Sequence, residues 1–176
     1  MTTELATMPP PPAEPPAATL APPAVQLTPQ DRIEQNKDLI KLLAPDVQRH
    51  HLSNINGKRY MNVGGGIAVA NASGYAVSVS RVEFDKPTGM WEAAATLHCS
   101  STGAVIATAV GYVGDDESRW MNGPKAARNS MTQTRAEAKL CRANFGHLYI
   151  LLGASTDTPA EEMSNVRAAA SPPPVA

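Results

Sequence analysis

Aromatic side chains and cysteines are scarce in this sequence of 176 residues, and their scarcity limits how a core can be built. Phe, Trp and Tyr make up only 5% of the chain, against 43% hydrophobic residues overall. A core is therefore expected, built mainly from Ala, Val, Leu, Ile and Met. Two cysteines, Cys99 and Cys141, are too few for a disulfide framework. Both are predicted to be buried free thiols in a reducing compartment.

Long apolar runs are also lacking. No stretch approaches the ~18 apolar residues that a membrane span requires. The N-terminus shows no basic region followed by an apolar one, which is the pattern of a secretory signal. We therefore expect a soluble cytoplasmic protein without a membrane partner.

The chain has almost no net charge, with a formal value of −1 at pH 7. This excludes a bulk polycation, so an anionic partner would have to meet a local patch. Residues 30–153 contain 14 Lys and Arg against 11 Asp and Glu, a net charge of +3. The two ends of the chain carry the negative balance.

Proline is abundant, but only at those ends. Of 16 prolines, nine lie in residues 1–29 and four in residues 154–176. Such composition is typical of disordered or polyproline-like segments, which serve as solubilising tails or as docking arms for partners. The predicted organisation is a disordered arm at 1–29, one domain at 30–153 and a disordered tail at 154–176.

The first half of the domain contains one clear helical pattern. Residues 28–45 have a capping residue at Thr28 or Asp31, an apolar stripe, and Pro45 as the expected end. Residues 57–63 are predicted to be a strand. The three glycines at 64–66 are predicted to form a flexible turn, and 67–74 are either a short helix or a loop.

The second half predicts three strands and a helix. Residues 75–84, 90–99 and 104–113 have strand patterns, and they are separated by short turns at 86–89 and 100–103. Short turns between neighbouring strands indicate an antiparallel meander. A long helix is expected from about Pro124 to Phe145, with Gly146 as its C-terminal cap. The predicted fold class is α+β, a three-stranded meander packed by this helix and preceded by an N-terminal helix.

This last helix gathers its positive charge on one side. At about 100° per residue, its cations share a stripe roughly 100° wide, and Glu137 points away from it. The stripe consists of Lys125, Arg128, Arg135, Lys139 and Arg142. Ala127, Met131, Ala138, Cys141 and Phe145 fall in the neighbouring sector and are expected to pack on the meander.

A solvated helix face usually mixes charges, because like charges four residues apart destabilise a helix. The stripe therefore favours a polyanion, and phosphate groups could offset its repulsion. Lys58 and Arg59 extend the predicted patch. Arg119 and Trp120 flank the helix, with Trp120 either a base-stacking platform or, by preference, a hydrophobic anchor.

Other chemistries find little support in the sequence. His50, His51, His98 and His147 do not have zinc-site spacing, and the glycines at 64–66 lack the Lys-Ser/Thr of a nucleotide loop. The acidic run at 115–118 reads as a solvated loop. No paired nucleophile and base is found, so no catalytic residue, metal or cofactor is predicted.

The order of these elements resembles that of the Rad52-like single-strand annealing proteins, including the compact bacteriophage ones. In that superfamily a β-β-β-α core follows a strand of "G-[HKR]-R" character, and its helix carries a "K-R-A-L-R-x-x-G"-like run. The corresponding runs here are "NGKRYMNV" (56–63), "GYAVSVSRVEF" (74–84) and "AKLCRANFG" (138–146). The runs "SMTQTRAEAK" and "LLGASTDTPAEEM" also resemble segments of phage annealing proteins. The resemblance covers residues 52–163.

This resemblance implies ATP-independent annealing of single-stranded DNA in phage recombination and repair, in the cytoplasm of a bacterial host. It implies a ring or helical filament of many subunits, with DNA in a basic groove. Lys139 and Arg142 match as backbone contacts, Arg135 lies in the "TRA" run, and Arg59 matches the basic residue before the first strand.

A phage exonuclease or a host single-strand-binding protein would be a further partner. Two alternatives stay open. One is an accessory or scaffold protein that recruits partners through its Pro-rich arms, and the other is a small enzyme with an unrecognised pocket.

Overall fold

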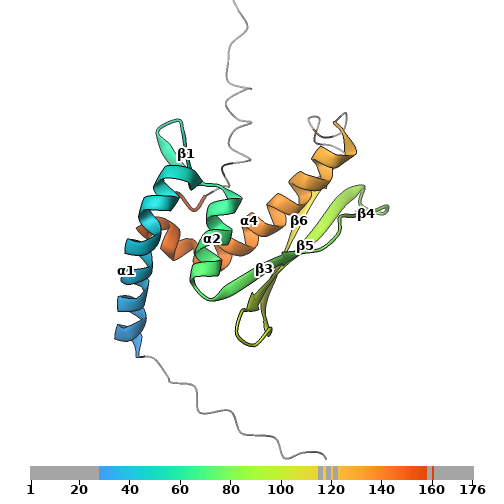
Figure 1. Ribbon diagram of the computed structural model, residues 1–176. Coiled ribbons are helices and arrows are strands. Elements are labelled where there is room, and N and C mark those ends of the chain that lie inside the picture. The colour runs from blue at the N-terminus through green and yellow to red at the C-terminus, as the bar shows by residue number, and fades with distance from the viewer. Residues whose placement is uncertain (1–27, 115–116, 118–119, 121–122, 158–159, 161–176) are drawn as a thin grey trace, which may run out of the picture.

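The protein has an α+β architecture, as predicted, in which a long C-terminal helix packs on an antiparallel sheet (Figure 1). The computed structural model describes residues 28–114, 117, 120, 123–157 and 160. The expectations for the arm at 1–27 and for the tail at 161–176 lie outside this range. No helix in the described ranges is long and apolar enough to cross a membrane.

The N-terminal helix α1 (Pro29–Asp46) begins where the sequence predicts. The Thr28 hydroxyl accepts from the Asp31 backbone N–H (3.2 Å), and the Asp31 carboxylate accepts from that of Thr28 (2.9 Å). The predicted end at Pro45 is wrong, because the chain continues through Asp46 into a π-helical turn, η1 (Val47–His51). Pro45 removes only one helical hydrogen bond, and the fully buried Val47 holds the next turn against the core.

A β-hairpin that the sequence predicts only in part follows this turn. Its first strand, β1 (Leu52–Ile55), was missed, whereas β2 (Lys58–Met61) lies within the predicted strand. Asn56 and Gly57 connect them with φ values of 53° and 79°, as a tight Asn-Gly hairpin turn requires.

The three consecutive glycines form the first turn of helix α2 (Val63–Ala72), so the predicted flexible turn is wrong. The Asn62 side chain caps this helix by accepting from the Gly65 N–H at 2.8 Å. A Cβ on Gly65 would lie 2.7 Å from Cβ of His51, and one on Gly66 would lie 2.9 Å from Cβ of Cys141. Glycine is needed here because α2 approaches its neighbours this closely.

The main sheet is a meander whose first strand is divided. The central strand β5 (Met90–Cys99) pairs with β6 (Val105–Gly114) on one side. On the other side it pairs with β3 (Tyr75–Val79) and then with β4 (Glu83–Asp85). The predicted single strand at 75–84 is interrupted at Ser80, whose hydroxyl accepts from the Ala94 N–H at 3.0 Å. All pairings are antiparallel, as predicted.

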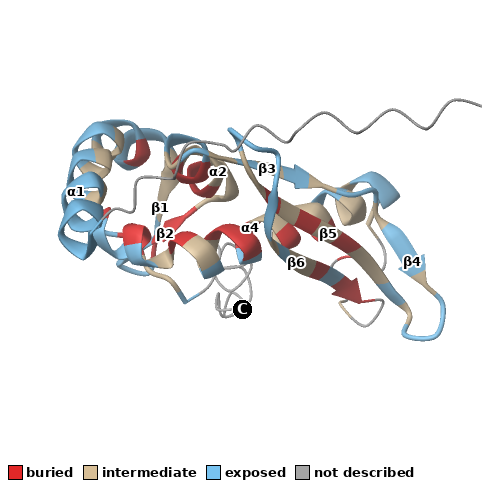
Figure 2. Cartoon of the chain, turned by 90° about the horizontal axis from the view of Figure 1, so that it is seen from below, coloured by how far each residue is buried: buried red, intermediate tan, exposed pale blue. Residues whose placement is uncertain are grey.

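Helix α4 (Lys125–Leu151) crosses one face of this sheet, and Figure 2 shows buried residues along α4 and β5. Gly111 of β6 allows close contact, because a Cβ there would lie 2.6 Å from the Thr132 carbonyl oxygen. The helix passes through Gly146, so the predicted cap at that position is wrong. Burial of Leu148 and Leu152 favours the extra turns, and Gly153, with φ of 81°, follows the helix.

Candidate nucleic-acid interface

Helix α4 is buried on two sides, and most of its cations lie on the side between them. Thr132, Ala136 and Leu140 face the sheet, and all three are at most 1% exposed. Roughly opposite, Cys141 and Tyr149 contact Gly66 of α2. At about 100° per residue, four of the five cations fall in the sector that separates these two contact surfaces, and Lys125 falls at the edge of the sheet-facing side. Of the residues predicted to pack, Ala138, Cys141 and Phe145 are buried, whereas Ala127 and Met131 are half-buried.

Arg135 forms a two-point ion pair at the centre of this stripe. Its Nη1 and Nη2 donate to Oε1 and Oε2 of Glu117 at 2.6 and 2.7 Å. Nη1 also donates to the Tyr112 carbonyl oxygen at 2.7 Å. The hydrogen bonds from Arg135 hold the pKa of Glu117 below its ordinary value. One acid therefore lies against the stripe. It is Glu117, which belongs to the run at 115–118 that was expected to be a solvated loop.

Lys139 lies one helical turn further along and remains exposed. Its Nζ is 3.4 Å from the Val110 carbonyl oxygen, two residues from the carbonyl that Arg135 contacts. Both carbonyls belong to β6, whose pairing among the described strands is with β5 alone. The central part of the stripe therefore runs along an open edge of the sheet.

The N-terminal part of the stripe lies over an aromatic pair. The Arg128 guanidinium carbon is 5.0 Å, and Lys125 Nζ 5.6 Å, from the ring centre of Trp91. The Phe84 ring lies 4.9 Å from that of Trp91 at a tilt of 43°. Cations stacked on an indole ring are stabilised by its quadrupole. The strand pattern places Trp91 on the face that packs against the helix, but sequence alone did not pair it with these cations.

Trp120 is only 9% exposed, so it is placed as the hydrophobic anchor at the entry of α4 and not as a stacking platform. Its backbone N–H donates to the Glu117 carbonyl oxygen at 2.8 Å. Arg119, expected to flank the helix, lies outside the described residues.

Arg142 points toward the hairpin rather than toward the sheet edge. It lines a small cavity with Met61, Asn62 and Ser155, among others. Its Nη1 is buried and has no hydrogen-bond partner among the described residues. Arg142 is therefore only half-exposed, and part of its guanidinium is directed inward.

The hairpin brings the last two predicted residues to this same end of α4. The chain after α4 runs beside β2, where the Ser155 N–H donates to the Arg59 carbonyl oxygen at 2.7 Å. Lys58 is exposed, and its Nζ is 3.8 Å from Asp157. Arg59 is also exposed. The contacts of Ser155 and Asp157 show that packed structure continues beyond residue 153.

The seven predicted cations divide into two groups. Lys125, Arg128, Arg135 and Lys139 follow β5 and β6, whereas Arg142, Lys58 and Arg59 lie by the hairpin.

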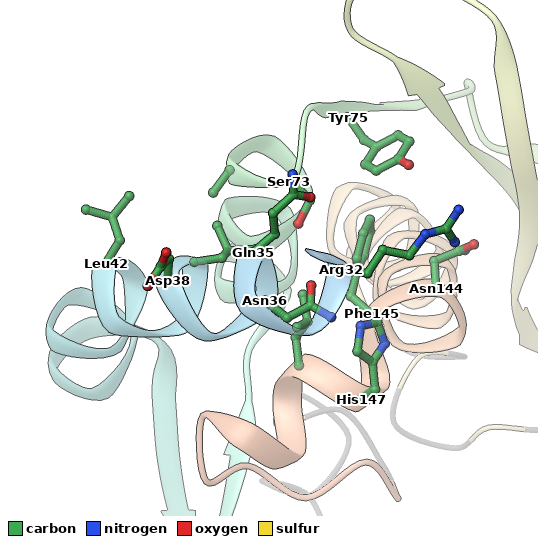
Figure 3. Close-up of a pocket in the computed structure, with 13 residues that line it drawn as sticks. Arg32, Gln35, Asn36, Asp38, Leu42, Ser73, Tyr75, Asn144, Phe145 and His147 are labelled. Carbon is green, nitrogen blue, oxygen red and sulfur yellow. The ribbon is translucent and has the colours of Figure 1, made fainter. Parts of the chain in front are cut away.

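A groove away from these cations lies between α1 and the C-terminal half of α4 (Figure 3). It has a volume of about 700 Å³, and its lining includes Arg32, Asn144, His147 and the rings of Tyr75 and Phe145. The seven predicted cations are not among its lining residues. Among the described residues, its ionisable side chains Arg32, Asp38 and His147 form no ion pair with one another. It does not present a recognisable catalytic arrangement.

A serine and a histidine of the sheet lie within hydrogen-bond distance of each other. His98 Nε2 lies 2.9 Å from the Ser78 hydroxyl on the open face of the sheet. A nucleophile and base would also need an acceptor that orients the imidazole, and none is seen among the described hydrogen bonds. Within the described ranges, no three His, Cys, Asp or Glu side chains are grouped as metal ligands.

The two thiols differ, which corrects one expectation. Burial raises the pKa of Cys141 to about 12, in agreement with its prediction as a buried thiol. Cys99 is half-exposed instead, at the turn between β5 and β6. Hydrogen bonds from Ser101 and Thr102 lower its pKa to about 7.

No family model, curated protein or solved structure matches the chain.

Proposed function

We propose that this protein binds single-stranded DNA and anneals complementary strands without hydrolysing a nucleotide. The observation that carries the proposal is the line of cations on the side of α4 between the open edge of β6 and the hairpin. Lys125 and Lys139 are exposed on this line, and the hairpin adds the exposed Lys58 and Arg59. A row of Lys and Arg side chains can contact the regularly spaced negative charges of a phosphate backbone.

The arrangement of elements supports the more specific proposal of a Rad52-like annealing protein of bacteriophage type. A meander of β3 with β4, β5 and β6 precedes α4, and a basic strand, β2, precedes the meander. This is the β-β-β-α order that the superfamily would require. The same proposal includes recombination and repair as the cellular process and the bacterial cytoplasm as its place.

In the proposed mode of binding, the cations contact the phosphate backbone of the DNA and leave the bases free to pair. Trp120 is buried and Trp91 lies beneath Arg128 and Lys125, so the indole rings are engaged in packing. Screening of phosphate repulsion by the cations then brings two strands together without sequence preference. This step needs no cofactor.

A ring or filament of many copies is proposed as the working form. The beginning of strand β6, before the carbonyls that Lys139 and Arg135 contact, has an open edge and carries exposed apolar side chains, with Val105 62% and Ile106 52% exposed. Open edges of this kind favour pairing with another chain. A phage exonuclease or a host single-strand-binding protein remains a proposed further partner.

Annealing of two complementary oligonucleotides without ATP tests the proposal, with duplex formation followed by fluorescence and particles imaged for rings. Wild type should accelerate annealing, and Lys125→Glu/Lys139→Glu should lower the rate by about tenfold or more because phosphate contacts are lost. The matched control is Lys37→Glu/Lys41→Glu, which makes the same charge change on α1 and should anneal like wild type. Equal rates for the two double variants would contradict the proposal.

A further inference from the structure

Glu117 meets Arg135 with the geometry that a phosphate group would use. The two carboxylate oxygens each accept one guanidinium N–H, at 2.6 and 2.7 Å. This parallel two-point contact is the form in which arginine binds both carboxylates and phosphates. A further donor, the Gly114 backbone N–H, points at the same carboxylate oxygen Oε1 from 3.2 Å. The donors at this place are therefore already arranged around an anion.

The pair also lies on the proposed path of the DNA. Arg135 is four residues before the exposed Lys139 and seven after Arg128, which places all three on one side of α4. At 1.5 Å per residue, the neighbouring cations stand about 6 and 10 Å away along the helix axis. A backbone that follows the stripe would meet Arg135 between these two neighbours.

Exposure permits an exchange of one anion for another. The side chains of Glu117 and Arg135 are 33% and 20% exposed, so solvent reaches the pair. A carboxylate on a core ion pair would be held by burial as well as by charge. Arg135 also donates to the Tyr112 carbonyl oxygen, so the guanidinium keeps one anchoring hydrogen bond when the carboxylate is exchanged.

We propose that Glu117 is an internal counter-ion that occupies a phosphate site on α4 and is displaced when single-stranded DNA binds. This inference rests on the proposed function and adds its regulation. In the free protein Glu117 offsets repulsion among the cations of the stripe. In the complex a phosphate takes its place, so each binding event includes the breaking of one ion pair. Glu117 thereby lowers affinity and favours release, which annealing requires once the duplex has formed.

The test is a double-mutant cycle on binding of a fluorescent oligothymidylate, measured by anisotropy over a series of salt concentrations. Glu117→Gln keeps the size of the side chain and one acceptor oxygen. It should bind about fivefold to tenfold tighter than wild type. The log–log salt slope should steepen by about 0.7, as expected for one additional phosphate contact on a single strand.

The second arm of the cycle separates displacement from a general charge effect. In an Arg135→Gln background, adding Glu117→Gln should change affinity by less than about twofold, because the site itself is gone. Glu137→Gln removes the same charge from the opposite side of α4 and should leave affinity near that of wild type. Circular dichroism and thermal melting show that each variant is folded.

Two results would overturn the inference while leaving the proposed function intact. One is wild-type binding that Glu117→Gln does not tighten, and the other is an equal gain with and without Arg135. If wild type and all variants fail to bind the oligonucleotide at low salt, the proposed function itself fails, and the inference fails with it.

Discussion

Helices α1 and α4 are both rich in charge but balance it in different ways. Within α1, Lys37 lies 2.9 Å from Glu34 and Lys41 3.1 Å from Asp38, each pair three residues apart. Within α4, five cations accompany the single acid Glu137, and the acid that pairs with Arg135 comes from outside the helix. A helix side that faces water can neutralise itself locally. The single-signed side of α4 needs anions from elsewhere, which Glu117 supplies in part and, by our proposal, DNA supplies in full.

The two helices also differ in packing. Helix α1 has no buried residue, and Figure 2 shows it exposed along most of its length. Helix α4 is buried against both the sheet and α2. Changes on α4 should therefore affect folding or binding, whereas equal changes at the exposed positions of α1 should do little.

The largest expected difference is in stability after removal of one leucine side chain. Leu140 on α4 is 1% exposed and Leu42 on α1 is 75% exposed. Leu140→Ala should lower the free energy of unfolding by about 3 kcal/mol, because it leaves a cavity in the core. Leu42→Ala should stay within about 0.5 kcal/mol of wild type. Urea unfolding measures both, and equal losses would show that α1 is as much a part of the core as α4.

A smaller effect is expected where α4 touches β6. Gly111→Ala should cost about 1–3 kcal/mol, since its methyl group would press on the backbone of Ala136 and Thr132. Gly146→Ala makes the same change inside α4, where the nearest atom is Cγ2 of Thr156 at 3.6 Å. It should stabilise the protein by about 0.5–1 kcal/mol through helix propensity. A destabilising Gly146→Ala would argue that the helix ends there after all.

The smallest expected effect is on stability against acid. The pKa of Glu117 is lowered below its ordinary value of 4.5, so its ion pair contributes fully above that value. The contribution is lost as pH falls through the lowered folded-state pKa. Because the pair is partly exposed, Glu117→Gln should remove about 1 kcal/mol or less at pH 7, and progressively less as pH falls below 4.5 through the lowered folded-state pKa. A stability difference between wild type and Glu117→Gln that stays the same from pH 7 to acid pH would contradict this assignment.

Sequence periodicity was sufficient for the elements that pack by regular repeats. The meander and the long helix were predicted because alternating and helical patterns are local. The cation stripe followed from helical spacing alone. The hairpin strand β1 was missed although Asn56-Gly57 is a strong turn signal, because residues 52–55 lack a clear alternation.

Features that depend on contacts between distant residues were not predictable in the same way. The role of Gly65 and Gly66 depends on Met61, His51, Cys141 and Tyr149, which the sequence does not place beside them. Pairing of Glu117 with Arg135 joins residues that are 18 positions apart in the sequence. Gly146 resembled a cap because the burial of Leu148 and Leu152, which carries the helix past it, is a tertiary effect.

The salt dependence of single-stranded DNA binding tests the central claim most directly. Wild type, Lys139→Gln and Lys41→Gln would be titrated with the same oligothymidylate at several salt concentrations. If phosphates lie along α4, affinity falls steeply with salt and Lys139→Gln reduces the log–log slope by about 0.7, while Lys41→Gln leaves it unchanged. An affinity that is indifferent to salt, or equal slopes for all three proteins, would contradict the account.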